Sequence, residues 1–326
     1  MNNPFHRRSS RTRLRAGLGA TGVLTAAALV LSGCGANDDP QAEETASSAP
    51  ASGELVVGSA DFPESQVIAE IYAGALNSAG ITATTRPNIG SREIYYRALE
   101  DGSVQILPEY SGNLLLFADP EATAESAGEI MDALPEALEQ ESPDANIAVL
   151  EPAEAESKDA MVVTQATAEK YGLESIEDMA KVCDQLTIGA PTTFQERAYG
   201  LPGLLEKYGC EPGGFEAIND GGGEATLQAL LTDRIQVADI YTTTPSIEEN
   251  GLVVLEDPEN NFIAQQVLPL VNLDAVNDQA REVLNNVSSM LTTEDLIELN
   301  QAVSGDRKED PKTAAERWLK EKGLME

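Results

Sequence analysis

Short apolar runs alternate with helix-like patterns from residue 54 onward, and this alternation occurs twice along the chain. Residues 55–59 and 81–87 predict strands, and the segment that begins at Pro63 repeats apolar residues at helical spacing. After a helical region at about 121–140, the alternation begins again with a strand at residues 160–163. Strands that alternate with helices form mainly parallel sheets covered by helices, so the pattern predicts an α/β fold.

The region from residue 54 to residue 326 reaches the length at which one core stops growing and chains divide into lobes. The last helical segments, which include Trp318, need a sheet to cover, and the first run of strands is the nearest candidate. We therefore predict a first lobe built from 54–157 and 244–326, a second lobe at 158–243, and a two-segment hinge. Open α/β sheets bind ligands beyond the carboxyl ends of their strands, which places the predicted site between the lobes.

The N-terminus has the pattern of a secretory signal peptide. Five arginines and no acidic residue occupy the first 15 positions, and an apolar stretch follows at 16–31. The stretch ends in Leu31-Ser32-Gly33-Cys34, which resembles a bacterial lipobox. We therefore predict a lipoprotein signal peptide at 1–33, lipid attachment at Cys34, a tether at 34–53 and a position on the outer face of the cytoplasmic membrane. The alternative is an ordinary signal peptide with a chance cysteine.

Charge excludes one class of partner. Removal of residues 1–33 leaves 16 of the 21 basic residues and all 55 acidic residues, a formal charge of −39. A chain of this charge repels the phosphates of nucleic acid, so no nucleic-acid partner is predicted. The acidic surface serves solubility and does not identify a ligand, because salt screens exposed charges over roughly 10 Å.

Histidine and cysteine usage limits the chemistry further. The one histidine, His6, leaves with the signal peptide, so the mature chain has no imidazole for general-base catalysis or for a metal, and we predict no metal and no cofactor. Once Cys34 carries lipid, Cys183 and Cys210 remain in an oxidising compartment, and we predict that they form a disulfide. The alternative is two buried free thiols.

Four segments in the predicted loops carry a resemblance to a known family. The segments are Gly58-Ser59-Ala60-Asp61-Phe62, Pro108-Glu109-Tyr110-Ser111-Gly112, Glu196-Arg197-Ala198-Tyr199-Gly200-Leu201-Pro202-Gly203-Leu204 and Ala238-Asp239-Ile240-Tyr241-Thr242-Thr243. Through them the chain resembles the glycine betaine, choline and carnitine receptors of ABC importers over about 54–272. Each segment is weak alone, but their order and spacing match the family.

This resemblance implies a two-lobed periplasmic-binding-protein-like fold of type II and assigns roles to site residues. Tyr110 and Tyr241 would face a quaternary ammonium, which has no N–H group and is held by aromatic faces. Arg197 would bind the ligand carboxylate through two charge-assisted hydrogen bonds. The alternatives are core tyrosines with satisfied hydroxyls and an ion pair of Arg197 inside its own lobe. Further candidates for ligand contact, chosen by loop position, are Phe62, Asp61, Ser59, Ser91 and Thr242.

The chain departs from the family pattern at three positions. Ala60 stands where many relatives carry a lysine, and two further cage aromatics of close relatives fall near Ala160 and at Leu227. Either another aromatic residue completes the cage, or the ligand is a different small polar molecule. The candidates for completing it are Phe62, Phe194 and Tyr199. Asp61 is either a partner for a cation or an exposed loop carboxylate.

These observations together predict a monomeric, non-enzymatic receptor that delivers its solute to the membrane permease of an ABC importer. The expected solute is glycine betaine or a related quaternary-ammonium compound. One alternative is a receptor of the same fold for another small polar solute, such as an amino acid or an amine. A ligand sensor that docks on a signalling partner, and a secreted enzyme that uses paired carboxylates, are the more distant alternatives.

Overall fold

A computed structural model describes residues 53–305 and 307–326 of the 326-residue chain. The predicted signal peptide, the predicted lipid-attachment residue Cys34 and nearly all of the predicted tether lie outside the described residues. Across the described segments, no helix combines the length and the apolar character needed to cross a membrane.

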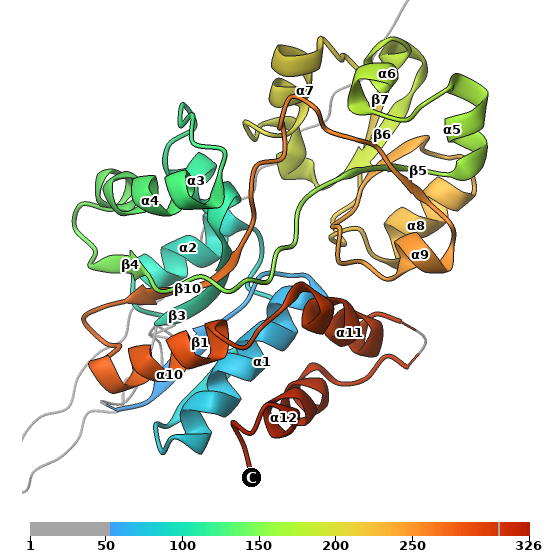
Figure 1. The fold of residues 1–326 in the computed structure, drawn as a ribbon. Coiled ribbons are helices and arrows are strands. Elements are labelled where there is room, and N and C mark those ends of the chain that lie inside the picture. The colour runs from blue at the N-terminus through green and yellow to red at the C-terminus, as the bar shows by residue number, and fades with distance from the viewer. Residues whose placement is uncertain (1–52, 306) are drawn as a thin grey trace, which may run out of the picture. The chain divides into compact units, whose positions relative to one another are not determined.

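The first of two sheets contains five strands in the order β2-β1-β3-β10-β4 (Figure 1). Strand β1 pairs in parallel with β2 and β3, whereas β10 runs antiparallel to β3 and β4. The sheet is therefore mixed, and one strand from late in the sequence lies between strands from early in the sequence. Its strands are β1 (Leu55–Gly58), β2 (Ala83–Arg86), β3 (Ile106–Tyr110), β4 (Ile147–Val149) and β10 (Val267–Asn272).

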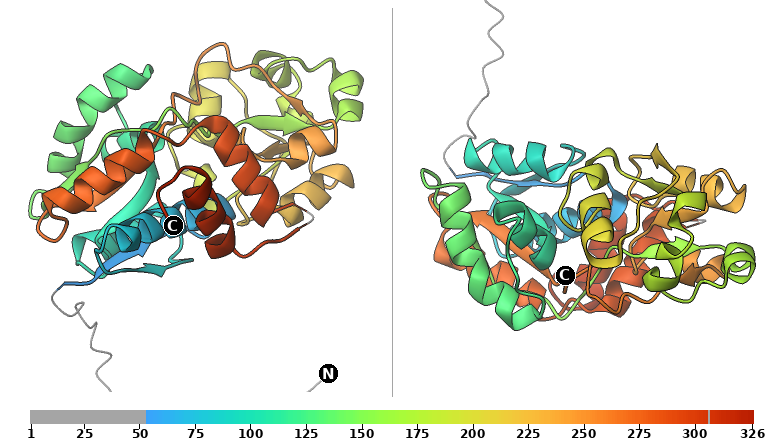
Figure 2. Two further views of the ribbon diagram at one scale, coloured as in Figure 1. Left: turned by 60° about the horizontal axis from the view of Figure 1, so that its bottom comes forward. Right: turned by 90° about the horizontal axis from the view of Figure 1, so that it is seen from above.

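Helices cover both faces of this sheet because its strands bury apolar side chains on both sides. Ile106 and Val267 belong to one core cluster, and their chain neighbours Leu107 and Leu268 belong to another, as alternation along a strand requires. Figure 2 shows α1 beside the late helices on one face. That face carries α1 (Pro63–Ser78), α10 (Asp278–Ser288), α11 (Thr293–Val303) and α12 (Pro311–Glu321), and the other carries α2 (Arg92–Glu100), α3 (Ser111–Ala118) and α4 (Ala127–Glu141).

The second sheet also has five strands, in the order β7-β6-β8-β5-β9. Strand β6 is parallel to β7 and β8, whereas β5 is antiparallel to β8 and β9. Two further core clusters pack around it. Its strands are β5 (Met161–Val163), β6 (Thr187–Ala190), β7 (Gly214–Ala217), β8 (Val237–Asp239) and β9 (Val253–Val254). The accompanying helices are α5 (Gln165–Tyr171), α6 (Ile176–Ala180), η1 (Cys183–Gln185), η2 (Thr192–Gln195), α7 (Leu201–Tyr208), α8 (Glu224–Leu231) and α9 (Ser246–Glu249).

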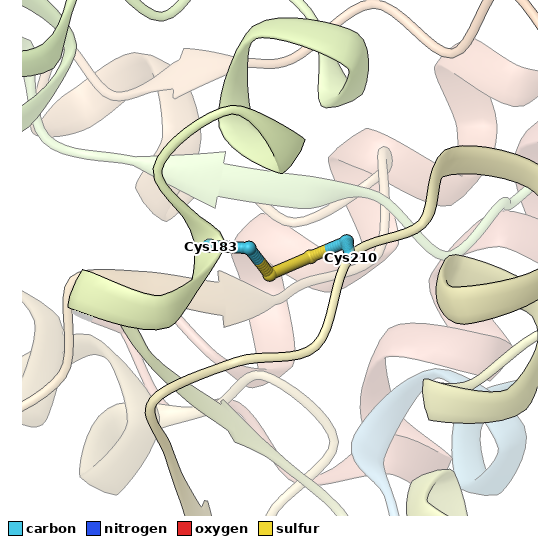
Figure 3. Close-up of a disulfide and its surroundings, with 2 residues drawn as sticks. All are labelled: Cys183 and Cys210. Atoms are coloured by element: carbon cyan, nitrogen blue, oxygen red, sulfur yellow. A yellow bond between two sulfur atoms is a disulfide. The ribbon is translucent and has the colours of Figure 1, made fainter.

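The predicted disulfide is present. Cys183, in the turn η1, is bonded to Cys210, which follows α7, and their Cα atoms are 5.5 Å apart (Figure 3). Both residues are buried in a core cluster of the second sheet. The bond therefore ties the segment before β6 to the segment before β7.

The chain crosses between the two sheets twice, and the two crossing segments lie side by side (Figure 1). The first crossing joins β4 to β5, and the second joins β9 to β10. The amide of Ser157 donates to the carbonyl of Gln265 at 3.1 Å, and the amide of Val267 donates to the carbonyl of Ala155 at 3.0 Å. Two antiparallel segments linked by backbone hydrogen bonds thus connect the lobes.

The second crossing comes later in the sequence than residue 244, where we predicted the return to the first lobe. Strand β9 pairs with β5 of the second sheet, and Phe262 belongs to a core cluster of that sheet. The next residue, Ile263, packs in a cluster of the first sheet. The segment that contains α9 and β9 completes the second lobe first, which the sequence pattern did not reveal.

Candidate functional site

A cavity of about 350 Å³ lies between the two lobes, with walls formed by loops and strand ends of both sheets. Its volume falls in the range of small-molecule sites. The lining residues of the first lobe are Ala60, Asp61, Phe62, Gly90, Ser91, Arg92, Ile94, Tyr95, Tyr110 and Asn113. The others are Ser157 in the first crossing and Asp159, Pro191, Thr192, Thr193, Arg197, Asn219, Gly221 and Tyr241 in the second lobe.

Three aromatic rings gather on one part of the cavity wall. Phe62 precedes α1, Tyr110 ends β3, and Tyr241 follows β8 in the other lobe. The ring centroid of Phe62 is 6.0 Å from that of Tyr110 and 5.2 Å from that of Tyr241. Aromatic side chains from both lobes therefore form one cluster, and faces of this kind attract a cation.

A buried carboxylate holds Tyr110 in place from behind. The Tyr110 hydroxyl donates to Glu64 Oε1 at 2.7 Å, and Glu64 also accepts hydrogen bonds from Thr243 and Asn300. Burial, together with the Glu64 carboxylate, raises the pKa of Tyr110 well above its usual value. The phenol therefore stays neutral, and the network ties the first lobe to Thr243, just beyond β8.

A glycine turn from the second lobe approaches these rings closely. Gly221 has φ +63°, and a Cβ atom built on it would lie 2.8 Å from Cβ of Phe62 and 3.5 Å from the Tyr241 ring. A side chain at this position would be strained and would meet the ring cluster. The turn Gly221-Gly222-Gly223 therefore lets one lobe reach the aromatic wall of the other.

The first lobe contributes a closed ion pair beneath the cavity. Arg92 donates to both carboxylate oxygens of Glu109, from Nε at 2.8 Å and from Nη2 at 3.0 Å. The Tyr95 hydroxyl and the backbone amide of Tyr110 donate to the same carboxylate, at 2.7 and 2.9 Å. Four donors satisfy Glu109 completely, so this pair holds α2 against the end of β3.

The second lobe contributes two buried acids. Asp159 precedes β5 and lines the cavity, and Asp239 ends the neighbouring strand β8. Burial raises the pKa of both carboxyl groups, and the Asp159 charge raises the pKa of Asp239 further, to well above its usual range. Asn113 donates to Asp159 Oδ2 at 2.7 Å and favours the charged form of Asp159, so Asp239 is the member of the pair that holds its proton more tightly.

Arg197 faces the cavity from the second lobe and has two partners. Its Nη1 donates to the Tyr199 hydroxyl at 2.7 Å, and its Nη2 lies 3.3 Å from Glu93 Oε1, in the first turn of α2. The ion pair therefore joins the two lobes, in contrast to the pair inside one lobe that we considered as an alternative role. Desolvation lowers the pKa of Arg197, but Tyr199 and the Glu93 carboxylate outweigh it and raise this pKa, so Arg197 remains charged.

The structure brings together six of the eight predicted ligand-contact residues and leaves two outside. Asp61, Phe62, Ser91, Tyr110, Arg197 and Tyr241 line the cavity. Ser59 is fully buried, with its hydroxyl bonded to the carbonyl of Ala60, and Thr242 accepts from the amide of Lys158. Both hydroxyls serve the local backbone, so loop position alone was a poor guide for these two residues.

Of the three candidates for completing the aromatic cage, one lines the cavity and two are core residues. Phe62 lines the cavity, whereas Phe194 and Tyr199 pack edge to face in a core cluster of the second lobe. Tyr199 reaches the site only through its hydroxyl, which binds Arg197. The aromatic cluster is therefore Phe62, Tyr110 and Tyr241.

Several cavity residues were absent from the sequence-based set. They include Arg92, Tyr95, Asn113 and Asp159. One signal was available for the acid pair, because Asp239 is a charged residue between apolar strand residues in the segment Val237–Ile240. A buried charge in such a strand requires a partner, but its partner lies in a separate segment of the sequence.

Known proteins resemble this chain over most of its length. It is 26% identical over 282 residues to the glycine betaine-binding protein YehZ of Escherichia coli, covering 84% of this chain and 92% of that protein. It is 24% identical over 275 residues to the carnitine transport binding protein OpuCC of Listeria monocytogenes, covering 83% and 87%.

Solved structures share the fold. A crystal structure described as a glycine betaine/carnitine/choline ABC transporter superposes with a TM-score of 0.65 at 24% identity, covering 83% of this chain and all of that chain. This similarity confirms the type II periplasmic-binding-protein fold with two mixed sheets.

A family profile spans both lobes. Residues 53–321 match the family described as OpuAC, substrate binding domain of ABC-type glycine betaine transport system. Members of this family are extracytoplasmic receptors of transporters and not enzymes, which removes the secreted-enzyme alternative. The chain belongs to the OpuAC family of substrate-binding domains of ABC-type glycine betaine transport systems.

Proposed function

We propose that this receptor captures a quaternary-ammonium solute against the ring cluster of Phe62, Tyr110 and Tyr241. The observation that carries the proposal is the meeting of these rings from two lobes beside the negative Asp159. A quaternary ammonium has no N–H donor, so ring faces and a nearby carboxylate are the groups that can bind it. In this proposal Asp61, Ser91 and Arg197 provide polar contacts at the remaining walls.

The hinge and the anchor extend this proposal. We divide the chain into a first lobe of 54–157 and 263–326 and a second lobe of 158–262, joined by the two crossing segments. Rotation about these segments would open the cavity for solute entry and close it before delivery to an ABC permease. Lipid at Cys34 would hold the receptor on the outer face of the cytoplasmic membrane, where it would act as a monomer.

Calorimetric titration of the purified receptor tests the ligand class. Choline, glycine betaine and carnitine form the test panel, and proline and ectoine represent other small solutes. We expect at least one quaternary amine to bind, and Tyr241→Ala to weaken that binding by about 1–2 kcal/mol, which is the value of one desolvated cation–π contact.

Tyr171→Ala is the matched control, because Tyr171 lies in α5, away from the cavity residues. It should leave the affinity unchanged. Binding of proline or ectoine with no response to any quaternary amine would contradict the proposal.

A further inference from the structure

We infer that Glu93 is a specificity-determining residue that neutralises Arg197 and favours cationic ligands that lack a carboxylate. This inference rests on the proposed function, because it divides quaternary amines into simple cations such as choline and zwitterions such as glycine betaine. Glu93 lies in the first turn of α2, between the cavity-lining residues Arg92 and Ile94, and forms an ion pair with Arg197 of the other lobe.

The geometry leaves Arg197 with no terminal nitrogen that lacks a partner. Nη1 donates to the Tyr199 hydroxyl, and Nη2 faces Glu93 Oε1. The Ser91 hydroxyl donates to the other oxygen of Glu93 at 2.5 Å and holds the carboxylate in this orientation. Although desolvation opposes it, the Ser91 hydrogen bond and the Arg197 charge lower the pKa of Glu93, so it is ionised when it meets Arg197.

A ligand carboxylate has to compete with this arrangement. A guanidinium binds a carboxylate best through two parallel hydrogen bonds. Glu93 already occupies one of the nitrogens that such a contact needs. A zwitterionic ligand must therefore displace Glu93 or place a second negative charge next to it, and both cost affinity.

The other charges around Arg197 act in the same direction. The second arginine of the cavity, Arg92, is satisfied by Glu109 and offers no free charge to a ligand. The Asp159–Asp239 pair contributes one negative charge, and Asp61 contributes another at the rim. Ala60, which also lines the cavity, carries no charge. The charged groups of the cavity therefore sum to a net negative charge, which a simple cation compensates and a zwitterion does not.

Titration of choline and glycine betaine into three proteins tests the inference. These are the wild type, Glu93→Gln and the control Glu196→Gln, which removes the same charge from an exposed position next to Arg197 in sequence. We expect the wild type to bind choline about tenfold or more tighter than glycine betaine, a difference of about 1.4 kcal/mol in binding free energy.

Glu93→Gln should strengthen the binding of glycine betaine by a similar factor of about ten and leave the affinity for choline within about threefold of the wild-type value. The variant then loses most of the difference between the two affinities. The Glu196→Gln control should preserve the wild-type ratio. These two results together would support a specificity role for Glu93.

Three other results would each be decisive. If Glu93→Gln weakens both ligands by the same factor, Glu93 only helps to close the lobes, and the inference is overturned. Tighter binding of glycine betaine than of choline by the wild type would overturn it as well. If the wild type binds neither ligand, the inference is overturned, and if it does not bind carnitine either, the proposed function itself fails.

Discussion

Two buried carboxyl groups, one in each lobe, differ in how completely they are satisfied. Glu109 of the first lobe accepts four hydrogen bonds, two of them from Arg92. Asp239 of the second lobe has an Oδ1 atom that no donor among the described residues reaches, and its neighbour is another acid, Asp159. Both oxygens of the first carboxyl group have donors, and one oxygen of the second has none among the described residues.

This difference indicates that the first carboxyl group supports the cavity wall and that the second belongs to the acid pair that attracts a cation. The ion pair of Glu109 fixes the positions of two rings, because Tyr110 follows Glu109 directly and the Tyr95 hydroxyl donates to the same carboxylate. Asp159 lines the cavity and accepts its hydrogen bond from the neutral amide of Asn113, so its charge can attract a cation that arrives from outside. The first lobe therefore shapes the cavity, and the second lobe supplies the charge that a cationic solute compensates.

The largest expected effect is the loss of the complete pair. Glu109→Gln leaves Arg92 buried without a counter-charge, and breaking a buried pair in this way costs about 3–5 kcal/mol. Urea denaturation should show this loss as a lower midpoint. The double variant Arg92→Met with Glu109→Gln removes both charges and should recover much of the stability. A loss below about 1 kcal/mol in the single variant would mean that the pair does not support the cavity.

A smaller and pH-dependent effect is expected at the incomplete pair. Because the native pKa of Asp239 is raised, the folded protein retains a proton that the unfolded chain releases above about pH 4. The contribution of Asp239 to the free energy of unfolding therefore falls as pH rises from about 4 toward the native pKa, by about 1.4 kcal/mol for each pH unit in that window. Asp239→Asn removes this loss, and its amide can donate to Asp159.

Urea denaturation of Asp239→Asn between about pH 4 and pH 8 measures this effect. The variant should gain stability relative to the wild type as pH rises. The exposed Asp61→Asn serves as the control and should follow the wild-type curve. If the plots of stability against pH for Asp239→Asn and the wild type run parallel across the range, Asp239 does not retain its proton in the folded protein and the assignment is wrong.

The fold was predictable where the pattern was local. The strand at 55–59, the helix from Pro63 and the strand at 160–163 all correspond to observed elements, because each has a clear apolar period. The membership of β9 in the second lobe was missed, because its pairing with β5 brings together distant segments. The antiparallel placement of β10 beside β3 is non-local for the same reason.

The site was predictable where a motif carried the information. Tyr110, Tyr241 and Arg197 came from the family resemblance and meet at one cavity. Position in a loop does not determine where a side chain points, and Ser59 illustrates this, because its hydroxyl bonds the neighbouring backbone. The contact between Glu93 and Arg197 joins residues of two lobes, and no spacing in the sequence indicates it.

The most direct test of the account is a crystal structure of the receptor grown with saturating choline. We predict that the ligand nitrogen lies within about 6 Å of the ring centroids of Tyr110 and Tyr241, on the side of Asp159. Choline bound at any other place, with the cavity between the lobes holding only water, would contradict the central claim that the two lobes trap a cation at their shared aromatic wall.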